Sequence, residues 1–310
     1  MALDPALDPG IAGFLQLIEA SGYPPMSEST PEVARKAFRA MTCDLVTDET
    51  RVPVGSTEDV VADGVPCRVY RPDVAGPVPT LVYVHGGGFV IGDLETHDQT
   101  CRRLCSGADV VVLSVDYRLA PEAAYPAAVE DVLTAVRWAH AHLDELGGAS
   151  VLGVGGDSAG GNLSAVASQA LPDLVDAQVL IYPAVDMAGQ HPSKEENGTG
   201  YFLDTPTMLW FGGHYLGSGA DVTDVRHSPL LAESFEGLPP AVVVTAQFDP
   251  LRDEGEAYAA KLAEAGVAVD VHRYDGLIHG FIDMGPLSPA AADAVDDVAA
   301  RAKALLHGLV

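Results

Sequence analysis

Hydrophobic and polar residues alternate along the chain with two different periods. The first is helical, because apolar residues recur at Ile11, Phe14, Leu15 and Ile18, the spacing of one helix face. A second helix is predicted to begin at Thr30–Pro31, since Thr is a good N-terminal cap and Pro suits the first helical position. Neither segment belongs to an obvious sheet.

Short apolar runs typical of β-strands follow, and helical runs separate most of them. They span residues 58–62, 66–71, 79–85, 109–117, 150–156, 177–183, 240–247 and 267–274. Two runs, LVYV at 81–84 and AVVVTA at 241–246, are continuous, which indicates strands buried on both faces of a parallel sheet. The 310 residues therefore predict a single α/β domain over 1–310, with a mostly parallel eight-stranded sheet and helices on both faces.

The alternation of strands and helices breaks between residues 186 and 219. A polar loop is followed there by a helix-like run that carries Trp210, Phe211 and Tyr215. Together with the N-terminal helices, this insertion predicts a small helical cap formed by residues 1 to about 50 and 186–219. The three aromatic residues could pack within the cap or line a substrate pocket, and both alternatives stay open.

The net charge of the chain indicates which kinds of binding partner are unfavourable. The chain has 17 basic and 44 acidic residues, which gives a formal net charge of −27. Such a field repels the phosphate backbone of nucleic acids and anionic lipid surfaces, so we expect no nucleic acid and no membrane as a partner. A homodimer stays open as an alternative for the assembly.

Sequence features that would direct the chain out of the cytoplasm are missing. The first basic residue is Arg35, so the N-terminal stretch lacks the positive region of a secretory signal. No uninterrupted apolar run reaches the length of a membrane span. The cysteines, Cys43, Cys67, Cys101 and Cys105, are too few and too confined to the first third for a disulfide framework. We therefore expect a cytoplasmic protein.

A glycine-rich stretch, LGVGGDSAGGN at 152–162, lies where an apolar strand gives way to a helical run. Alone it could be a linker or a phosphate loop, but its flanks do not suit a linker, and Ser158 replaces the last glycine of the dinucleotide fingerprint. It does match G-x-S-x-G at 156–160, a turn that presents a nucleophilic serine. Glycines on both sides avoid a collision between the converging strand and helix. Ser158 is therefore the candidate nucleophile.

A serine nucleophile needs a base to accept its proton and a carboxylate to orient that base. Asp249 follows an apolar strand, and His279 follows the last strand-like run. Both therefore lie at the carboxyl ends of strands, where parallel sheets carry their sites. Asp249 could instead be a helix cap. Asp253, Glu254 and Asp275 are kept as alternative acids.

A second glycine-rich stretch, HGGGF at 85–89, follows the LVYV run. Its backbone N–H groups are suited to bind the negative oxygen that develops during acyl transfer. Alone this stretch could be a phosphate-binding loop. Because the chain also has the serine turn, a loop that binds the oxyanion of acyl transfer is favoured. No H-E-x-x-H motif is present, and His140 and His142 do not share a helix face, so we expect no metal and no cofactor.

With these motifs in this order, the chain resembles the bacterial hormone-sensitive lipase family of carboxylesterases, the family IV or GDSAG-type α/β-hydrolases. The resemblance rests on HGGGFVIGDLETHD (85–98), DYRLAPEAAYPAAVEDV (116–132), GDSAGGN (156–162), DPLRDEG (249–255) and HGF (279–281). These motifs span most of the predicted catalytic domain. The resemblance implies an α/β-hydrolase fold and hydrolysis of carboxylic esters.

The same resemblance implies a role for each motif. Ser158 would be the nucleophile, His279 the general base and then acid, and Asp249 the residue that orients His279. The N–H donors of the oxyanion hole would be Gly87, Gly88 and Ala159, supported by His85, Gly86 and Asp157. The candidate pocket residues are Phe89, Trp210, Phe211 and Tyr215.

The expected function is hydrolysis of short- to medium-chain acyl esters of small molecules through a covalent acyl-serine intermediate. A cap with few bulky apolar residues beyond its aromatic cluster predicts a preference for acyl chains of about two to eight carbons. A non-catalytic small-molecule receptor on the same fold is an alternative, which the presence of His279 disfavours. An acyltransferase would use the same triad with an alcohol as acceptor, and the sequence leaves this alternative open.

Overall fold

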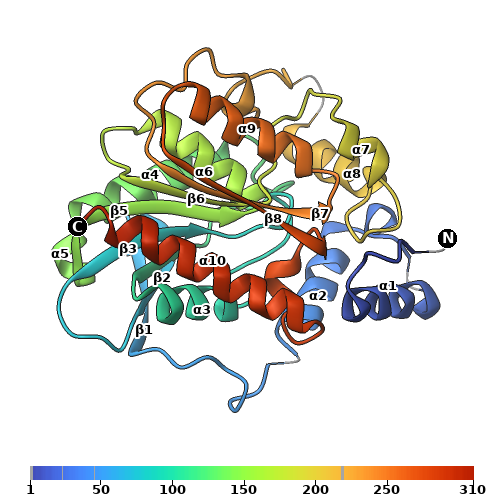
Figure 1. The fold of residues 1–310 in the computed structure, drawn as a ribbon, viewed down its shortest axis with the longest axis horizontal. Coiled ribbons are helices and arrows are strands. Elements are labelled where there is room, and N and C mark those ends of the chain that lie inside the picture. The colour runs from blue at the N-terminus through green and yellow to red at the C-terminus, as the bar shows by residue number, and fades with distance from the viewer. Residues whose placement is uncertain (1–2, 23, 45, 218–219) are drawn as a thin grey trace.

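The computed structural model of the protein describes residues 3–22, 24–44, 46–217 and 220–310. Its centre is an eight-stranded sheet in the order β1-β2-β4-β3-β5-β6-β7-β8 (Figure 1). The strands are β1 (Ser56–Ala62), β2 (Val65–Arg71), β3 (Val78–Val84), β4 (Val111–Val115), β5 (Gly148–Asp157), β6 (Ala177–Ile181), β7 (Ala241–Phe248) and β8 (Val269–Ile278). β2 pairs antiparallel with β1 and β4, and the other neighbours pair parallel. The predicted α/β fold with a mostly parallel eight-stranded sheet is confirmed.

Burial explains why the central strands are mostly apolar. Every residue of β3, β4 and β6 is buried, because helices cover these strands on both faces. The edge strand β1 is mostly exposed and correspondingly polar. Each of the strand-like runs in the sequence coincides with a strand of the sheet.

Helices cover both faces of this sheet (Figure 1). One face carries α3 (Asp98–Ala108) and α10 (Pro289–His307), whose apolar residues share one core cluster with the strands. The other face carries α4 (Ala127–Ala141), α6 (Ala159–Ala170) and α9 (Arg252–Glu264). The short helix α5 (Leu143–Leu146) leads into β5, and the 3-10 turns η2 (Pro229–Leu231) and η3 (Phe281–Asp283) lie in loops.

Four further helices gather near the N-terminus at one end of the sheet (Figure 1). They are α1 (Pro9–Ser21), α2 (Pro31–Thr42), α7 (Pro192–Glu196) and α8 (Thr205–Leu216), with the 3-10 turn η1 (Met26–Glu28). Both predicted N-terminal helices are confirmed, since α1 buries Ile11 and Leu15, and the Thr30 side chain accepts from the Val33 N–H at the start of α2. A separate cap stays a prediction. Residues 1–2, 23, 45 and 218–219 of its expected ranges lie outside the described residues.

Helix α8 contains two glycines in succession, Gly212 and Gly213. A Cβ atom at either position would meet no described atom outside its own helix within 4 Å, so packing does not require glycine there. Each glycine in a helix interior is less favourable than alanine by about 1 kcal/mol. The position of α8 therefore depends on its packed side chains, such as the fully buried Tyr215.

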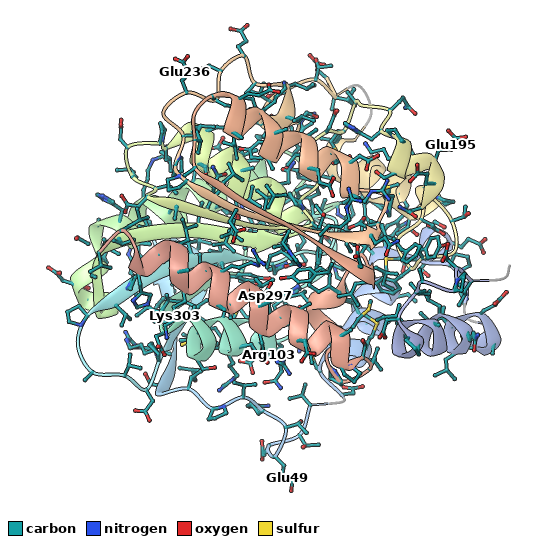
Figure 2. All side chains as sticks on the ribbon, in the orientation of Figure 1. Glu49, Arg103, Glu195, Glu236, Asp297 and Lys303 are labelled. Carbon is teal, nitrogen blue, oxygen red and sulfur yellow. The ribbon has the colours of Figure 1, made fainter. Side chains whose placement is uncertain are left out.

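Acidic side chains project from several sides of the molecule. Glu49, Glu195 and Glu236 are exposed and point away from the ribbon (Figure 2). In the described part of the chain, no helix combines the length and the apolar character needed to cross a bilayer.

Candidate active site

Ser158 lies in the tight turn between β5 and α6, and its backbone has φ 54° and ψ −116°. A positive φ is unfavourable for a residue with a side chain, because the backbone is crowded there. A Cβ atom at Gly156 or at Gly160 would collide with the carbonyl oxygen of Val84 on β3. The two glycines of the motif are therefore a steric requirement of the turn, which places Ser158 in the wall of a cavity.

The side chains of Ser158, His279 and Asp249 form a hydrogen-bonded chain. His279 Nε2 lies 2.9 Å from Ser158 Oγ, and His279 Nδ1 lies 2.8 Å from Asp249 Oδ2. Asp249 follows β7 and His279 follows β8, so two neighbouring parallel strands deliver them to the same edge of the sheet. Asp249 is fully buried, and its Oδ1 accepts from the Leu251 N–H at 2.8 Å.

The alternative acids lie in other surroundings. Asp253 accepts from the backbone N–H of Ser193 at 2.8 Å and is paired with Arg252. Glu254 is buried and pairs with a lysine ammonium at 2.7 Å, whereas Asp275 is exposed. Among the described residues, Asp249 alone places a carboxylate within hydrogen-bonding distance of the His279 ring.

The glycine loop after β3 lines the same cavity as Ser158. Gly87 and Gly88 have φ of 107° and 58°, conformations that glycine adopts readily. A Cβ atom at Gly88 would collide with the ring of Phe211. Ala159 also lines the cavity and is the first residue of α6, where a backbone N–H has no partner within the helix. The three residues expected to form an oxyanion hole thus line the same cavity as the serine.

Asp157 and His85 fix this loop in place. Asp157 Oδ1 accepts from the Gly86 N–H at 2.9 Å and from the Tyr83 hydroxyl at 2.7 Å. His85 Nδ1 lies 2.7 Å from the Gly86 carbonyl oxygen, and its ring stacks on Tyr117 with 4.3 Å between centroids. Burial, followed by a neighbouring histidine, lowers the pKa of His85 to about 4, so its ring is neutral at neutral pH.

A cavity of about 2200 Å³ adjoins Ser158 and His279. This volume exceeds the range of about 300–1,000 Å³ found for typical small-molecule pockets. Helices α1, α2 and α8 contribute apolar side chains to its wall, among them Phe14, Ile18, Phe38, Met41, Met208 and Leu209. The sequence analysis missed this wall. The available signal was the broad apolar face of α1, where Phe14, Leu17 and Ile18 accompany the core residues.

Two of the four predicted pocket residues, Phe89 and Phe211, line the cavity. Tyr215 is fully buried and stacks on Phe89 with 3.7 Å between ring centroids. Trp210 packs edge-on against Phe211 with 5.2 Å between centroids. Neither Trp210 nor Tyr215 belongs to the described lining, and each packs against one of the two lining rings.

Within the described ranges, no three His, Cys, Asp or Glu residues are grouped so that they could hold a metal ion. The cysteines of the chain are present as free thiols, and three of them are buried.

The chain is similar to known proteins over most of its length. The family model described as the alpha/beta hydrolase fold matches residues 81–283. The carboxylic ester hydrolase LipN of Mycobacterium tuberculosis is 41% identical over 314 aligned residues, which cover 97% of this chain and 83% of that protein. The ethyl acetate hydrolase of Pseudomonas putida is 36% identical, and the match covers 94% of this chain and 96% of that protein.

Solved structures agree with these relatives. A point mutant of an alpha/beta hydrolase enzyme from the metagenome of Lake Arreo, Spain, has a TM-score of 0.93 at 41% identity, over 99% of this chain and 100% of that chain. A thermostable esterase from Pseudomonas putida has a TM-score of 0.92 at 35% identity, over 98% of this chain and 99% of that chain. With its fold, its motifs and these likenesses in agreement, the chain belongs to the hormone-sensitive lipase family of α/β-hydrolases.

Proposed function

We propose that this protein is a serine carboxylesterase that hydrolyses esters of small molecules through an acyl-Ser158 intermediate. The observation that carries the proposal is the hydrogen-bonded chain of Ser158, His279 and Asp249 beside a large cavity. A serine hydroxyl is a weak nucleophile, and a base within hydrogen-bonding distance activates it. The names of the relatives, a carboxylic ester hydrolase and an ethyl acetate hydrolase, support the same reaction class.

The reaction begins when His279 Nε2 accepts the proton of Ser158 Oγ as this oxygen attacks the ester carbonyl. Asp249 stabilises the imidazolium, and the N–H groups of Gly87, Gly88 and Ala159 stabilise the negative oxygen. His279 then gives its proton to the leaving alcohol oxygen, and acyl-Ser158 remains. Water attacks this ester with His279 again as base, which releases the carboxylic acid and restores the serine hydroxyl.

Covalent labelling tests this proposal directly. A fluorophosphonate is expected to add a single phosphonyl group at Ser158, because only an activated serine attacks its phosphorus at an appreciable rate. Peptide mass spectrometry locates the label, and hydrolysis of p-nitrophenyl butyrate should be lost in proportion to it. A protein that neither hydrolyses esters nor takes the label would favour the receptor alternative. A label at another serine would exclude Ser158 as the nucleophile.

We further propose a preference for acyl chains of about two to eight carbons, each methylene adding about 0.8 kcal/mol of binding until the acyl site is full. The expectation of a cap with few bulky apolar residues is wrong, because helices α1, α2 and α8 supply several such side chains to the cavity. The preference itself is supported by the relative named for ethyl acetate, a short-chain ester.

A series of p-nitrophenyl esters from acetate to palmitate measures this preference. kcat/KM is expected to rise with chain length, to reach its maximum at or below about eight carbons, and to fall beyond it. A maximum at palmitate, together with activation at an oil–water interface, would identify a lipase whose acyl chain occupies the whole cavity. Product analysis with added alcohol, run on the best ester, separates hydrolysis from acyl transfer.

The expectations for location and assembly also stay proposals. The cytoplasm is the proposed location because of the sequence features described above. A homodimer is retained as an alternative to a monomer, and sedimentation of the purified protein decides between them.

A further inference from the structure

A buried group of ionisable side chains lies behind the serine turn and has no part in the reaction described above. Its centre is His97, which directly precedes α3 and is 1% exposed. His97 Nε2 lies 3.5 Å from Asp157 Oδ1 and 4.0 Å from Asp283 Oδ2. Its other ring nitrogen, Nδ1, lies 2.9 Å from the Thr96 hydroxyl oxygen. One imidazole therefore stands between two carboxylates.

Each carboxylate is attached to a different part of the site. Asp157 is the residue before Ser158, and it accepts from the Gly86 N–H of the glycine loop at 2.9 Å. Asp283 closes the turn η3 that follows His279, and its backbone N–H donates to the Gly280 carbonyl at 3.2 Å. His97 is thus placed where the serine turn, the glycine loop and the histidine turn meet.

The positive charge of this cluster resides on His97. Burial by itself would lower the pKa of His97, but Asp157 and Asp283 outweigh it and raise the pKa to about 9. The ring of His85 lies 5.3 Å away between centroids, and burial followed by the charge of His97 lowers its pKa to about 4. The negative charge of Asp93 also raises the pKa of His97, but less strongly. The Tyr83 ring packs against His97 with 6.4 Å between ring centroids.

The carboxylates respond to this charge in different ways. Burial opposes the ionisation of Asp157, yet His97 holds its pKa below the ordinary value of an aspartate. Burial raises the pKa of Asp283 to about 6 in spite of His97, and its Oδ1 accepts from the Thr100 hydroxyl at 2.9 Å. At neutral pH the cluster therefore holds one cation between two anions. Removal of the cation would raise the pKa of Asp283 further, so the two carboxylates would repel each other until Asp283 takes up a proton.

We propose that the imidazolium of His97 is a positioning group of the esterase reaction, which holds Asp157 and Asp283 so that the glycine loop, Ser158 and the turn of His279 keep their mutual geometry. This inference rests on the proposed function. His97 touches no reacting atom and acts through the two carboxylates. Its contribution is to the transition state, because a displacement of about 1 Å in such a site costs on the order of 100-fold in rate.

The substitution His97→Gln tests the proposal, since glutamine keeps a polar group but no positive charge. kcat for p-nitrophenyl butyrate is expected to fall by about 10- to 100-fold, with KM within about threefold. The matched control is His227→Gln, which also removes a fully buried imidazole. His227 packs edge-on against Tyr125 and is not part of the described cavity lining. The control should leave kcat within about threefold of the original protein.

A second variant distinguishes charge compensation from packing. If His97 acts by neutralising two anions, Asp283→Asn in the His97→Gln background removes one of the repelling charges when kcat is measured at about pH 9, which favours the ionised form of Asp283. kcat should then return to within about threefold of the Asp283→Asn single variant. If the imidazole only fills space, the two losses multiply instead, and the proposal is overturned.

The charge state of His97 is measured in the unaltered protein, which covers the case in which His97→Gln fails to fold. Nitrogen-15 NMR of histidine-labelled protein should show both ring nitrogens of His97 protonated at pH 7, where a free imidazole is mostly neutral. A neutral His97 ring, or a folded His97→Gln variant with full kcat, would overturn the inference. These outcomes differ from failure of the proposed esterase function, in which the unaltered protein would neither hydrolyse esters nor react with the fluorophosphonate.

Discussion

Ser158→Ala is expected to lower kcat for p-nitrophenyl butyrate by about 10⁴- to 10⁶-fold. The substitution removes the single oxygen that lies 2.9 Å from His279 Nε2, so no acyl-enzyme can form. The glycine loop and the cavity stay in place, and KM should therefore change far less than kcat. Steady-state kinetics with enzyme at high concentration, to reach the low residual rate, measure both constants.

The control for this experiment is Ser168→Ala, ten positions further along α6. Ser168 is also buried, but its hydroxyl donates to the Ser164 carbonyl at 3.0 Å and does not approach the cavity lining. Its kcat should stay within about threefold of the unaltered protein. If Ser158→Ala retained full activity while folding normally, another nucleophile would be at work.

Asp249→Asn is expected to lower kcat by up to about 10⁴-fold. Asp249 Oδ1 accepts from the Leu251 N–H, and Oδ2 faces His279 Nδ1. An asparagine that keeps the first bond with its oxygen must turn its NH₂ group towards His279. Nδ1 then has to accept, the ring proton moves to Nε2, and this nitrogen can no longer take the proton of Ser158. The pH dependence of kcat/KM and the tautomer of His279, read by NMR, check both parts of the argument.

Asp253→Asn is the matched control, because the two aspartates lie four positions apart on either side of the start of α9. Asp253 bonds to the Ser193 N–H and to Arg252, away from His279. This variant should keep kcat within about threefold. A damaging Asp253→Asn combined with a mild Asp249→Asn would mean that the wrong carboxylate has been assigned.

The sequence predicted the sheet because the signal for a buried parallel strand is local. A run such as 241–246 is predominantly apolar where helices cover both faces of the sheet, and β7 occupies that place. The order of Ser158, Asp249 and His279 could be read for the same reason. Each follows a recognisable strand, and strand ends of a parallel sheet converge on one edge.

What the sequence did not predict depends on contacts between distant segments. The cavity wall combines α1 and α8, whose separate helical patterns do not tell which faces meet. Tyr215 was an equal candidate for pocket or packing, and its stacking on Phe89 joins two segments whose contact the sequence does not reveal. His97 lies within the motif at 85–98, but its position between two carboxylates depends on Asp283, which is far away in the sequence. Hydrophobic periodicity carries no information about such pairs.

The successive glycines of α8 are positions where substitution can change which substrates fit the cavity. Gly212 and Gly213 line the cavity, and a Cβ atom added at either would meet no described atom outside the helix within 4 Å. Stabilising substitutions often cost function where an active site needs flexibility or strain. Here a bulkier residue would narrow the space for substrate and improve helix propensity in the same step. Single substitutions at these two positions are therefore expected to change the substrate range without loss of helix stability.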